Sequence, residues 1–469
     1  MKNSPIHSAR MTLLWVCALM ALLLTSCARN LPAEQPVSIT PIVLTPGTGT
    51  PTPVASNDWT MYHANLARTG YLADVPDPQR LTNLWKHALD GAVYAEPLVL
   101  AGRVIVATEN DTLYALDART GQVQWHTHVG TPVPLSDLPC GNIDPLGITG
   151  TPVYDPQTGL VFAVAEVQGP GHILVGLDVK TGEVKVRRSV DPAGADPRVH
   201  QQRAALALAG GRVYVAYGGL DGDCGDYQGK VVAARTDGTG DLLVYQVPTP
   251  REAGIWAPPG PVQDDQGNLY VSVGNGEVTQ GDWDHSDSIL KLSPTLQLED
   301  AFAPQSWPSD NANDLDLGSM GPVLLPNGLI FTAGKLGQGY LLQADHLGGV
   351  GGQIQTLSAC VAFGGAAVSG ESFYIPCTDG LRQFTITAGP KVVPGWQAPQ
   401  QVSGSPIIGG QTIYSVDSDG GVLYALNAAT GQVRATLAID ATSRFATPSL
   451  SQDTLFIGTM TGVVAVTIG

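Results

Sequence analysis

Three loops in the middle of the chain carry clusters of aspartates, and carboxylate oxygens are ligands that calcium prefers. The clusters are Asp221, Asp223 and Asp226; Asp282, Asp284 and Asp287; and Asp310, Asp314 and Asp316. None has the D-x-[DN]-x-[DN]-G spacing of an EF-hand, so we interpret them as surface turns, with calcium binding as the alternative. His126 and His128 would share one face of a strand, but no third ligand completes a zinc site beside them.

These loops interrupt a unit that the chain repeats eight times, in which three short apolar strands are separated by turns rich in Gly and Asp. The clearest copy is GRVIVATENDTLYALDARTGQVQW, from Gly102 to Trp125, and residues 410–433 are a near twin. The second strands are rich in Val, Ile, Tyr and Phe, which is typical of β-strands. The first strands of the eight copies open at Pro97, Pro152, Ala205, Pro261, Pro322, Ala366, Pro406 and Pro448.

The repeat predicts an all-β fold, namely an eight-bladed β-propeller with four antiparallel strands in each blade. A single blade cannot bury both of its faces, so the copies must stack, and radial stacking gives a propeller. The last copy stops after its third strand at Gly469, and residues 81–89, ahead of the first copy, could supply the missing strand. No copy has a convincing helical period. The rival architecture, two separate β-sandwiches, is disfavoured because one motif persists throughout.

The composition agrees with a turn-rich all-β domain and excludes some partners. The chain has 56 Gly and 35 Pro, and only 14% of its residues are charged. Its net charge is −17 and it has no basic patch, so we expect no nucleic-acid binding and no electrostatic attachment to anionic lipid. We expect a monomer that offers one face of the propeller to a protein or a small-molecule ligand.

The first residues predict export. Lys2 and Arg10 make a basic start ahead of an apolar run at 11–24. This is a signal-peptide pattern, and the run is short for a membrane helix. Residues 24–27, Leu-Thr-Ser-Cys, resemble the bacterial lipoprotein cleavage box, which implies a signal peptide at 1–26 and a lipid on Cys27. Residues 27–57 are rich in Pro and Thr and are expected to form a disordered tether ahead of a propeller at 58–469. We therefore expect an extracytoplasmic protein held at a membrane by its lipid alone.

Four cysteines remain beyond the signal peptide and the lipid site: Cys140, Cys224, Cys360 and Cys377. An exported chain folds in an oxidising compartment, so this even number favours two disulfides. We favour Cys360–Cys377, on consecutive strands of one blade, and then Cys140–Cys224, between loops of neighbouring blades. The other pairings stay open, and zinc is disfavoured because the sequence has no C-x-x-C spacing.

Three charged residues stand where they could ring a central channel. Arg203 and Arg444 come just before the first strands of the third and eighth copies, and Glu96 just before that of the first. Polar groups that hold water in the channel are the alternative interpretation.

The repeat YALDxxTGxxxW, with the opening segments DWTMYH at 58–63 and ARTG at 67–70, resembles bacterial propellers of the pyrroloquinoline quinone (PQQ) type. The resemblance covers about residues 58–469. It implies the quinoprotein alcohol dehydrogenase-like superfamily, which contains PQQ-dependent dehydrogenases and also cofactor-free propellers. One of the latter is an outer-membrane-assembly lipoprotein that binds other proteins.

Dehydrogenases of that superfamily bind PQQ and calcium near the propeller axis, and five positions here match their motifs. The resemblance implies that Trp256, in GIWAPPGP, stacks on PQQ and that Lys335, in TAGKLGQ, contacts its quinone oxygens. It implies Glu166 and Asn275 as calcium ligands and Asp287 as the general base. Each residue also has a structural interpretation, as packing, turn or surface charge. The adjacent Cys-Cys pair of many members and a C-x-x-C-H haem site are absent from the sequence.

Two functions from different classes fit these observations. The favoured one is a lipid-anchored extracytoplasmic propeller that acts as a protein- or ligand-binding scaffold. The alternative is a PQQ- and calcium-dependent quinoprotein dehydrogenase that oxidises alcohols or polyols. The dehydrogenase requires the five matched residues to surround one axial pocket, whereas the scaffold does not.

Overall fold

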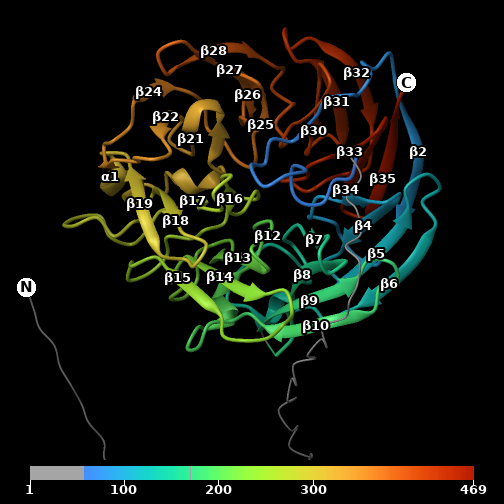
Figure 1. Ribbon diagram of the computed structural model, residues 1–469, viewed down its shortest axis with the longest axis horizontal. Coiled ribbons are helices and arrows are strands. Elements are labelled where there is room, and N and C mark those ends of the chain that lie inside the picture. The colour runs from blue at the N-terminus through green and yellow to red at the C-terminus, as the bar shows by residue number, and fades with distance from the viewer. Residues whose placement is uncertain (1–56, 170) are drawn as a thin grey trace, which may run out of the picture. The chain divides into compact units, whose positions relative to one another are not determined.

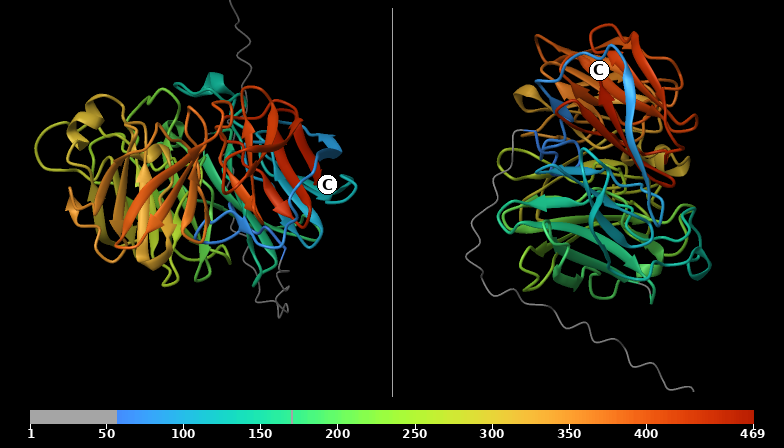
Figure 2. Two further views of the ribbon diagram at one scale, coloured as in Figure 1. Left: turned by 90° about the horizontal axis from the view of Figure 1, so that it is seen from above. Right: turned by 90° about the vertical axis from the view of Figure 1, so that its right-hand side faces the viewer.

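Eight antiparallel sheets are arranged around one axis in the computed structural model, which describes residues 57–169 and 171–469 (Figure 1). Seen from the side, their strands run from one face of the ring to the other (Figure 2). The predicted eight-bladed propeller with four-stranded blades is therefore confirmed. Blades one to four contain β3 (Leu98–Leu100), β4 (Arg103–Ala107), β5 (Thr112–Asp117) and β6 (Val123–His128); β7 (Val153–Asp155), β8 (Leu160–Val167), β9 (Gly171–Asp178) and β10 (Val184–Ser189); β12 (Ala207–Ala209), β13 (Arg212–Gly219), β14 (Lys230–Arg235) and β15 (Leu243–Gln246); and β16 (Val262–Gln263), β17 (Leu269–Val273), β18 (Ser288–Leu292) and β19 (Leu298–Ala303).

The remaining blades repeat the pattern, and the last one uses both ends of the domain. Blades five to eight contain β20 (Val323–Leu325), β21 (Leu329–Ala333), β22 (Gln338–Gln343) and β24 (Gln355–Ser358); β25 (Ala367–Ser369), β26 (Ser372–Ile375), β27 (Arg382–Thr387) and β28 (Lys391–Gln397); β29 (Ile407–Gly409), β30 (Thr412–Asp417), β31 (Val422–Asn427) and β32 (Val433–Ala438); and β33 (Ser449–Ser451), β34 (Thr454–Thr459), β35 (Gly462–Ile468) and β2 (Leu81–Ala88). Strand β2 pairs antiparallel with β35, from Leu81 opposite Ile468 to Ala88 opposite Gly462 (Figure 1). The predicted closing strand is therefore confirmed, and it removes a free sheet edge.

Short elements decorate this ring. Strands β1 (Tyr71–Leu72) and β23 (Gly349–Val350) pair in parallel with β29 and β19, and β11 (His200–Gln201) pairs with β13. Helix α1 (Trp307–Ala312) lies between β19 and β20, and at six residues it is too short to give the sequence a helical period. The 3₁₀ turns are Leu135–Asp137, Pro197–Val199, Leu317–Ser319 and Pro326–Gly328. No helix in the described ranges has the length and apolar content needed to cross a membrane.

The burial of the strands follows their distance from the axis. Strand β8 is buried at seven consecutive positions because neighbouring blades cover both of its faces. The outermost strand β6 instead alternates, with Trp125 buried between exposed residues, because one face meets solvent.

A tryptophan–glycine contact recurs between neighbouring blades. Trp125 of blade one donates from Nε1 to the carbonyl oxygen of Val179 in blade two, at 3.1 Å. Gly182, from the Asp-x-x-Thr-Gly turn, allows this contact because a Cβ there would lie 2.6 Å from the indole. Trp85 and Trp396 repeat the arrangement, donating to Ala118 and Ala428 and packing on Gly121 and Gly431. The turn glycine of the repeat thus has two roles. It adopts the positive φ of the turn, and it leaves room for the tryptophan of the neighbouring blade.

The segment ahead of β1 crosses the axis and ties distant blades together. Thr60 accepts a backbone hydrogen bond from Tyr154 of blade two, and Gly70 accepts one from Ile408 of blade seven. Between them, Arg68 is 4% exposed and donates to Leu206 and Pro261, at the starts of blades three and four. The segment therefore closes one end of the central channel.

Both predicted disulfides, Cys140–Cys224 and Cys360–Cys377, are confirmed. The position of the second disulfide differs from the predicted one. Cys360 follows β24, the last strand of blade five, and Cys377 follows β26 of blade six. The bond therefore joins neighbouring blades rather than strands of one blade, because residues 359–366 form the crossing from the rim of one blade to the axis of the next.

The signal peptide expected at 1–26, the lipid site Cys27 and nearly all of the tether at 27–57 lie outside the described residues. They remain predictions.

Candidate functional site

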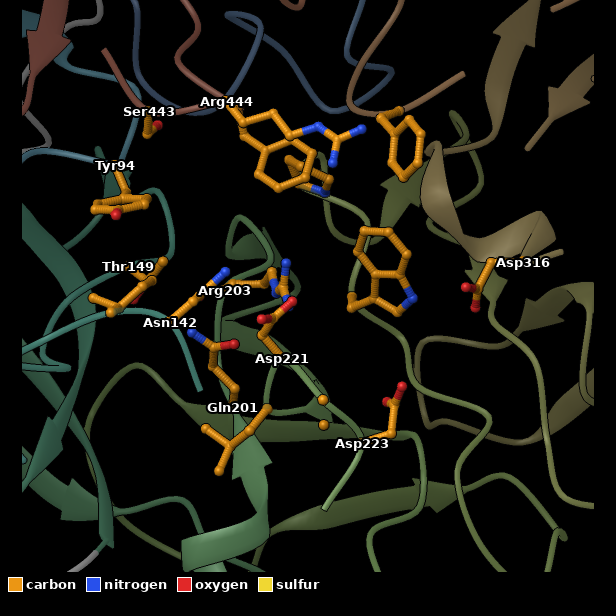
Figure 3. Close-up of a pocket in the computed structure, with 18 of the residues that line it drawn as sticks. Tyr94, Asn142, Thr149, Gln201, Arg203, Asp221, Asp223, Asp316, Ser443 and Arg444 are labelled. Atoms are coloured by element: carbon orange, nitrogen blue, oxygen red, sulfur yellow. The ribbon is translucent and has the colours of Figure 1, made fainter. Parts of the chain in front are cut away.

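A cavity of about 670 Å³ lies on the axis, at the face where the innermost strands begin (Figure 3). All of these strands start at the same face, so the loops that precede them meet there. Glu96, Arg203 and Arg444, expected around the channel, all line this cavity, and so do Trp256 and Asp316. Side chains from loops of different blades thus reach one space (Figure 3).

The most densely connected group on the wall is centred on the carboxylate of Asp316, which is 3% exposed. The Lys335 ammonium lies 2.5 Å from Asp316 Oδ2 and 2.7 Å from Asp314 Oδ1. Asp316 Oδ1 accepts the backbone N–H of Asn275 at 2.8 Å. The Asn275 amide also faces this carboxylate, and with its nitrogen turned inward it donates to both oxygens, at 2.7 and 3.1 Å.

The glycine of the Gly-Asn turn in blade four is required for a steric reason. A Cβ on Gly274 would lie 2.1 Å from Asp316 Oδ1 and 3.0 Å from Trp256 Nε1. Only a residue without a side chain lets the carboxylate and the indole approach the backbone from two sides. Asn275, Asp316 and Trp256 are therefore held together by the turn that the sequence motif identified.

The electrostatics of this group favour a carboxylate that can take up a proton. Burial raises the pKa of Asp316, and the neighbouring Lys335 opposes that shift. Burial alone would lower the pKa of Lys335, but the carboxylates of Asp316 and Asp314 outweigh it and raise that pKa. The lysine is therefore a fixed cation beside a buried acid, and perturbed pairs of this kind are typical of functional sites.

The adjoining part of the wall, which includes Trp256, combines aromatic rings with guanidinium groups. The Cζ atom of Arg203 lies 5.2 Å from the centroid of the Trp256 ring, and that of Arg444 lies 4.0 Å from the Phe363 ring. Phe445 lies at 6.5 Å from Trp256, edge to face. Neither guanidinium forms an ion pair with a described residue. This wall can therefore hold a flat, anionic ligand.

Asp287 lies behind Asp316 rather than in the cavity wall. Its side chain is 0% exposed, and its Oδ1 accepts the backbone N–H of Leu317 at 2.9 Å. Burial, reinforced by the charge of Asp316, raises its pKa well above the usual range. A ligand in the cavity does not reach Asp287.

Glu166 is also absent from the lining of the cavity. Its Oε1 accepts the backbone N–H of Gln202 at 2.7 Å, and its Oε2 lies 3.5 Å from His172 Nε2. His172 Nδ1 in turn lies 2.6 Å from Asp191 Oδ1. Burial alone would lower the pKa of His172, but the two carboxylates raise it to about 10. The structure thus brings together Trp256, Asn275 and Lys335, but not Glu166 or Asp287.

Asp316 is one of four residues of this site, with Asp221, Asp223 and Asp314, that sequence reasoning placed in acidic surface turns. A signal for it was present, because Asp316 stands shortly before the first strand of its blade, as do Glu96, Arg203 and Trp256. The missed aromatic residues Tyr62, Phe363 and Phe445 also line the cavity. Two of them, Phe363 and Phe445, again lie just ahead of a first strand.

Comparisons with known proteins agree with this architecture. The sequence profile of a family described as outer membrane protein assembly factor BamB matches residues 77–279. The curated polyvinylalcohol dehydrogenase of Sphingopyxis sp. (strain 113P3) is 25% identical over 303 residues, which cover 55% of this chain and 43% of that protein. The chain therefore spans less than half the length of that relative.

Solved structures share the fold at low sequence identity. A quinohemoprotein alcohol dehydrogenase from Comamonas testosteroni has a TM-score of 0.65 at 16% identity, covering 87% of this chain and 80% of that one. A europium-containing methanol dehydrogenase has a TM-score of 0.69 at 16% identity, covering 88% and 98%. BamB from Moraxella catarrhalis has a TM-score of 0.58 at 16% identity, covering 82% and 99%.

The molecule is thus an eight-bladed propeller with a ligand-sized cavity on its axis. Its repeats are similar to those of PQQ-type propellers, the resemblance that the sequence indicated. The matched proteins are named as dehydrogenases and as an assembly factor.

Proposed function

We propose that the axial cavity is the active site of a quinone-dependent dehydrogenase that oxidises alcohols or polyols. The observation that carries this proposal is the Asp316–Lys335 pair beside Asn275 and Trp256 on one cavity wall. The relative named polyvinylalcohol dehydrogenase supports it. The sequence expectation favoured a binding scaffold and required five matched residues around one pocket for the enzyme. Three of them line the cavity, and Asp316 offers a carboxylate in place of Asp287, so we prefer the enzyme.

The cavity suits PQQ, a flat quinone with three carboxyl groups. Its volume of about 670 Å³ falls in the range of roughly 300–1,000 Å³ typical of small-molecule sites. The Trp256 ring offers a stacking face, and Arg203, Arg444 and Lys335 offer positive charge to carboxylates and quinone oxygens. Of the two residues matched to the calcium site, Asn275 lines the cavity, whereas Glu166 is engaged elsewhere.

When bound, the quinone supplies the hydride acceptor of the reaction. The chain supplies the base, and Asp316 suits this role better than Asp287 because it reaches the cavity. Its carboxylate takes the hydroxyl proton of the alcohol, and Lys335 holds that carboxylate in place through the 2.5 Å contact. The loops ahead of blades six and eight bring Phe363 and Phe445 to the lining of this space.

The experiment is reconstitution of the full chain with PQQ and calcium, followed by dye-linked oxidation of a series of alcohols and polyols. Asp316→Asn is expected to lower kcat by about 10²–10⁴-fold, the usual worth of a general base. Asp287→Asn is expected to keep most of the activity, and the exposed Asp419→Asn is the matched control. A protein that binds no PQQ, or an Asp316→Asn variant as active as the control, would refute the enzyme.

A protein-binding scaffold is the second candidate, and the family profile of an assembly factor favours it. The cavity lining includes Met460, an apolar residue that is 38% exposed. The scaffold predicts a defined cellular partner that cross-links at this face, together with the absence of PQQ binding.

We also propose that the protein works outside the cytoplasm. Two disulfides between blades or long loops are typical of an oxidising compartment. The lipid anchor at Cys27 remains part of this proposal, and its test is metabolic labelling with a fatty acid in the wild type and Cys27→Ala.

A further inference from the structure

Two buried carboxylates of blade one lie behind the cavity wall without a direct positive partner. Glu109 and Asp111 occupy the turn between β4 and β5 and are 2% and 0% exposed. Glu109 Oε2 accepts the N–H of Gly147 at 2.8 Å. Glu109 Oε1 and both carboxylate oxygens of Asp111 have no hydrogen-bond partner among the described residues. Burying such groups is costly unless they are paired.

The nearest cation does not relieve this charge. Arg187 attracts Asp111 electrostatically, but its Nη1 donates to the carbonyl oxygen of Val129 at 2.6 Å. Glu166, a third buried acid in the neighbourhood, adds repulsion. The pair therefore lacks a counter-charge that any described side chain supplies by contact.

Two glycines and the Val167 side chain border the Asp111 carboxylate. A Cβ on Gly147 would lie 2.9 Å from Asp111 Oδ1 and 2.3 Å from the carbonyl oxygen of Glu109. A Cβ on Gly130 would lie 3.2 Å from Asp111 Oδ2. Two carboxylates and a backbone carbonyl oxygen thus border the same small region.

Thr149 adds a neutral oxygen. Its side chain is 7% exposed, and its hydroxyl faces the Glu109 carboxylate without reaching hydrogen-bond geometry to any described residue. The same residue lines the axial cavity. Thr149 therefore stands between this cavity and the Glu109 carboxylate.

We propose that Glu109 and Asp111, completed by Thr149, the Glu109 carbonyl oxygen and water, bind a calcium ion. Protonation would remove the charge of Asp111 but leave its hydroxyl without an acceptor, because neither oxygen has a neighbour in hydrogen-bond range. The described residues contain no group of three His, Cys, Asp or Glu side chains arranged for a metal, so neutral oxygens must complete the set. Calcium tolerates such a mixed and irregular oxygen set better than magnesium.

This site is distinct from the Asn275–Asp316 position and does not depend on the dehydrogenase. The test uses the full chain stripped with EDTA and titrated with CaCl₂ by calorimetry, without PQQ. We expect saturable binding that persists in Asn275→Ala and in the exposed control Asp419→Asn. Asp111→Asn and Glu109→Gln are each expected to weaken it by about tenfold or more.

The outcomes separate the alternatives. Circular dichroism establishes that each variant is folded, and Thr149→Val provides a milder change that is expected to weaken binding less. Wild-type protein that binds no calcium at millimolar concentration would overturn the site. So would calcium binding that Asn275→Ala abolishes and Asp111→Asn leaves intact. Wild-type protein that binds calcium but shows no PQQ-dependent turnover would count against the enzyme and leave this calcium site standing.

Discussion

Replacing Arg68 by Met tests the idea that the segment ahead of β1 holds the propeller together. Arg68 is 4% exposed, and its guanidinium donates to Tyr62, Leu206 and Pro261 at 3.1, 2.9 and 3.4 Å. It also faces the buried Glu96. Methionine fills much of the same volume but removes every donor, so three carbonyl oxygens lose their partner.

The expected cost follows from these contacts. Each of the two shorter bonds from a charged donor is worth about 1.5–3 kcal/mol, and removing one partner of a buried charged group costs about 3–5 kcal/mol. We therefore expect a loss of about 3–5 kcal/mol. With an unfolding entropy of about 2.1 cal/mol/K per residue, this lowers the Tm of a domain of this size by about 3–6 °C.

The assay is thermal unfolding followed by calorimetry, with Arg119→Met as control. Arg119 is exposed, and its side chain forms no hydrogen bond with a described residue, so its replacement should change stability by less than about 0.5 kcal/mol. An Arg68→Met variant that melts within 1 °C of the control, a margin of about 1 kcal/mol, would refute the structural role of the segment. Adding Glu96→Gln should cost less in the Arg68→Met background than alone, because the two residues share one buried site.

Three further outcomes are expected. Because the pKa of His172 is raised to about 10, its ion pairs stabilise the fold fully below about pH 6.5 and are lost as pH rises through about 10. His172→Gln should therefore flatten the fall in Tm between these pH values. An equally steep fall in the variant would contradict the pairing with Asp191. Replacing Cys360 and Cys377 by Ser removes a link across 17 residues and should cost about 3 kcal/mol, seen as a Tm lower by about 3–4 °C without reductant; an unchanged Tm would count against it. Trp256→Ala should weaken PQQ binding, measured by absorbance titration, by about tenfold or more, and unaltered affinity would place the quinone elsewhere.

The order and the extent of the blades could be read from the sequence because each blade is a local unit. Residues such as Asp117 and Gly121 set a turn through contacts only a few positions apart. The strands between such turns alternate or stay apolar according to how many faces they bury. Even the closing pair β2–β35 followed from a missing strand in the last copy. Local hydrogen bonds and burial are enough to repeat a blade.

The cavity was predictable in place but not in detail. Glu96, Arg203 and Arg444 were expected near the axis because of their position before a first strand, and all three line it. The role of Asp316 required the tertiary structure, because its neighbours come from two different blades. Asn275 approaches Asp316 from blade four and Lys335 approaches it from blade five. No periodic pattern in the sequence indicates these contacts.

Sequence alone determined the repeat, the number of blades and the strand that closes the ring, because each follows from short-range patterning or from counting. It favoured the pairing of the cysteines, which the structure then established. Only the tertiary structure decided which acids face the cavity and which are sealed behind it. Asp287 and Asp316 both stand in loops with similar composition, yet one is fully buried and the other meets Lys335 at the wall. The physical reason is that the direction of a loop side chain is set by the blade against which the loop packs, and that blade is distant in sequence.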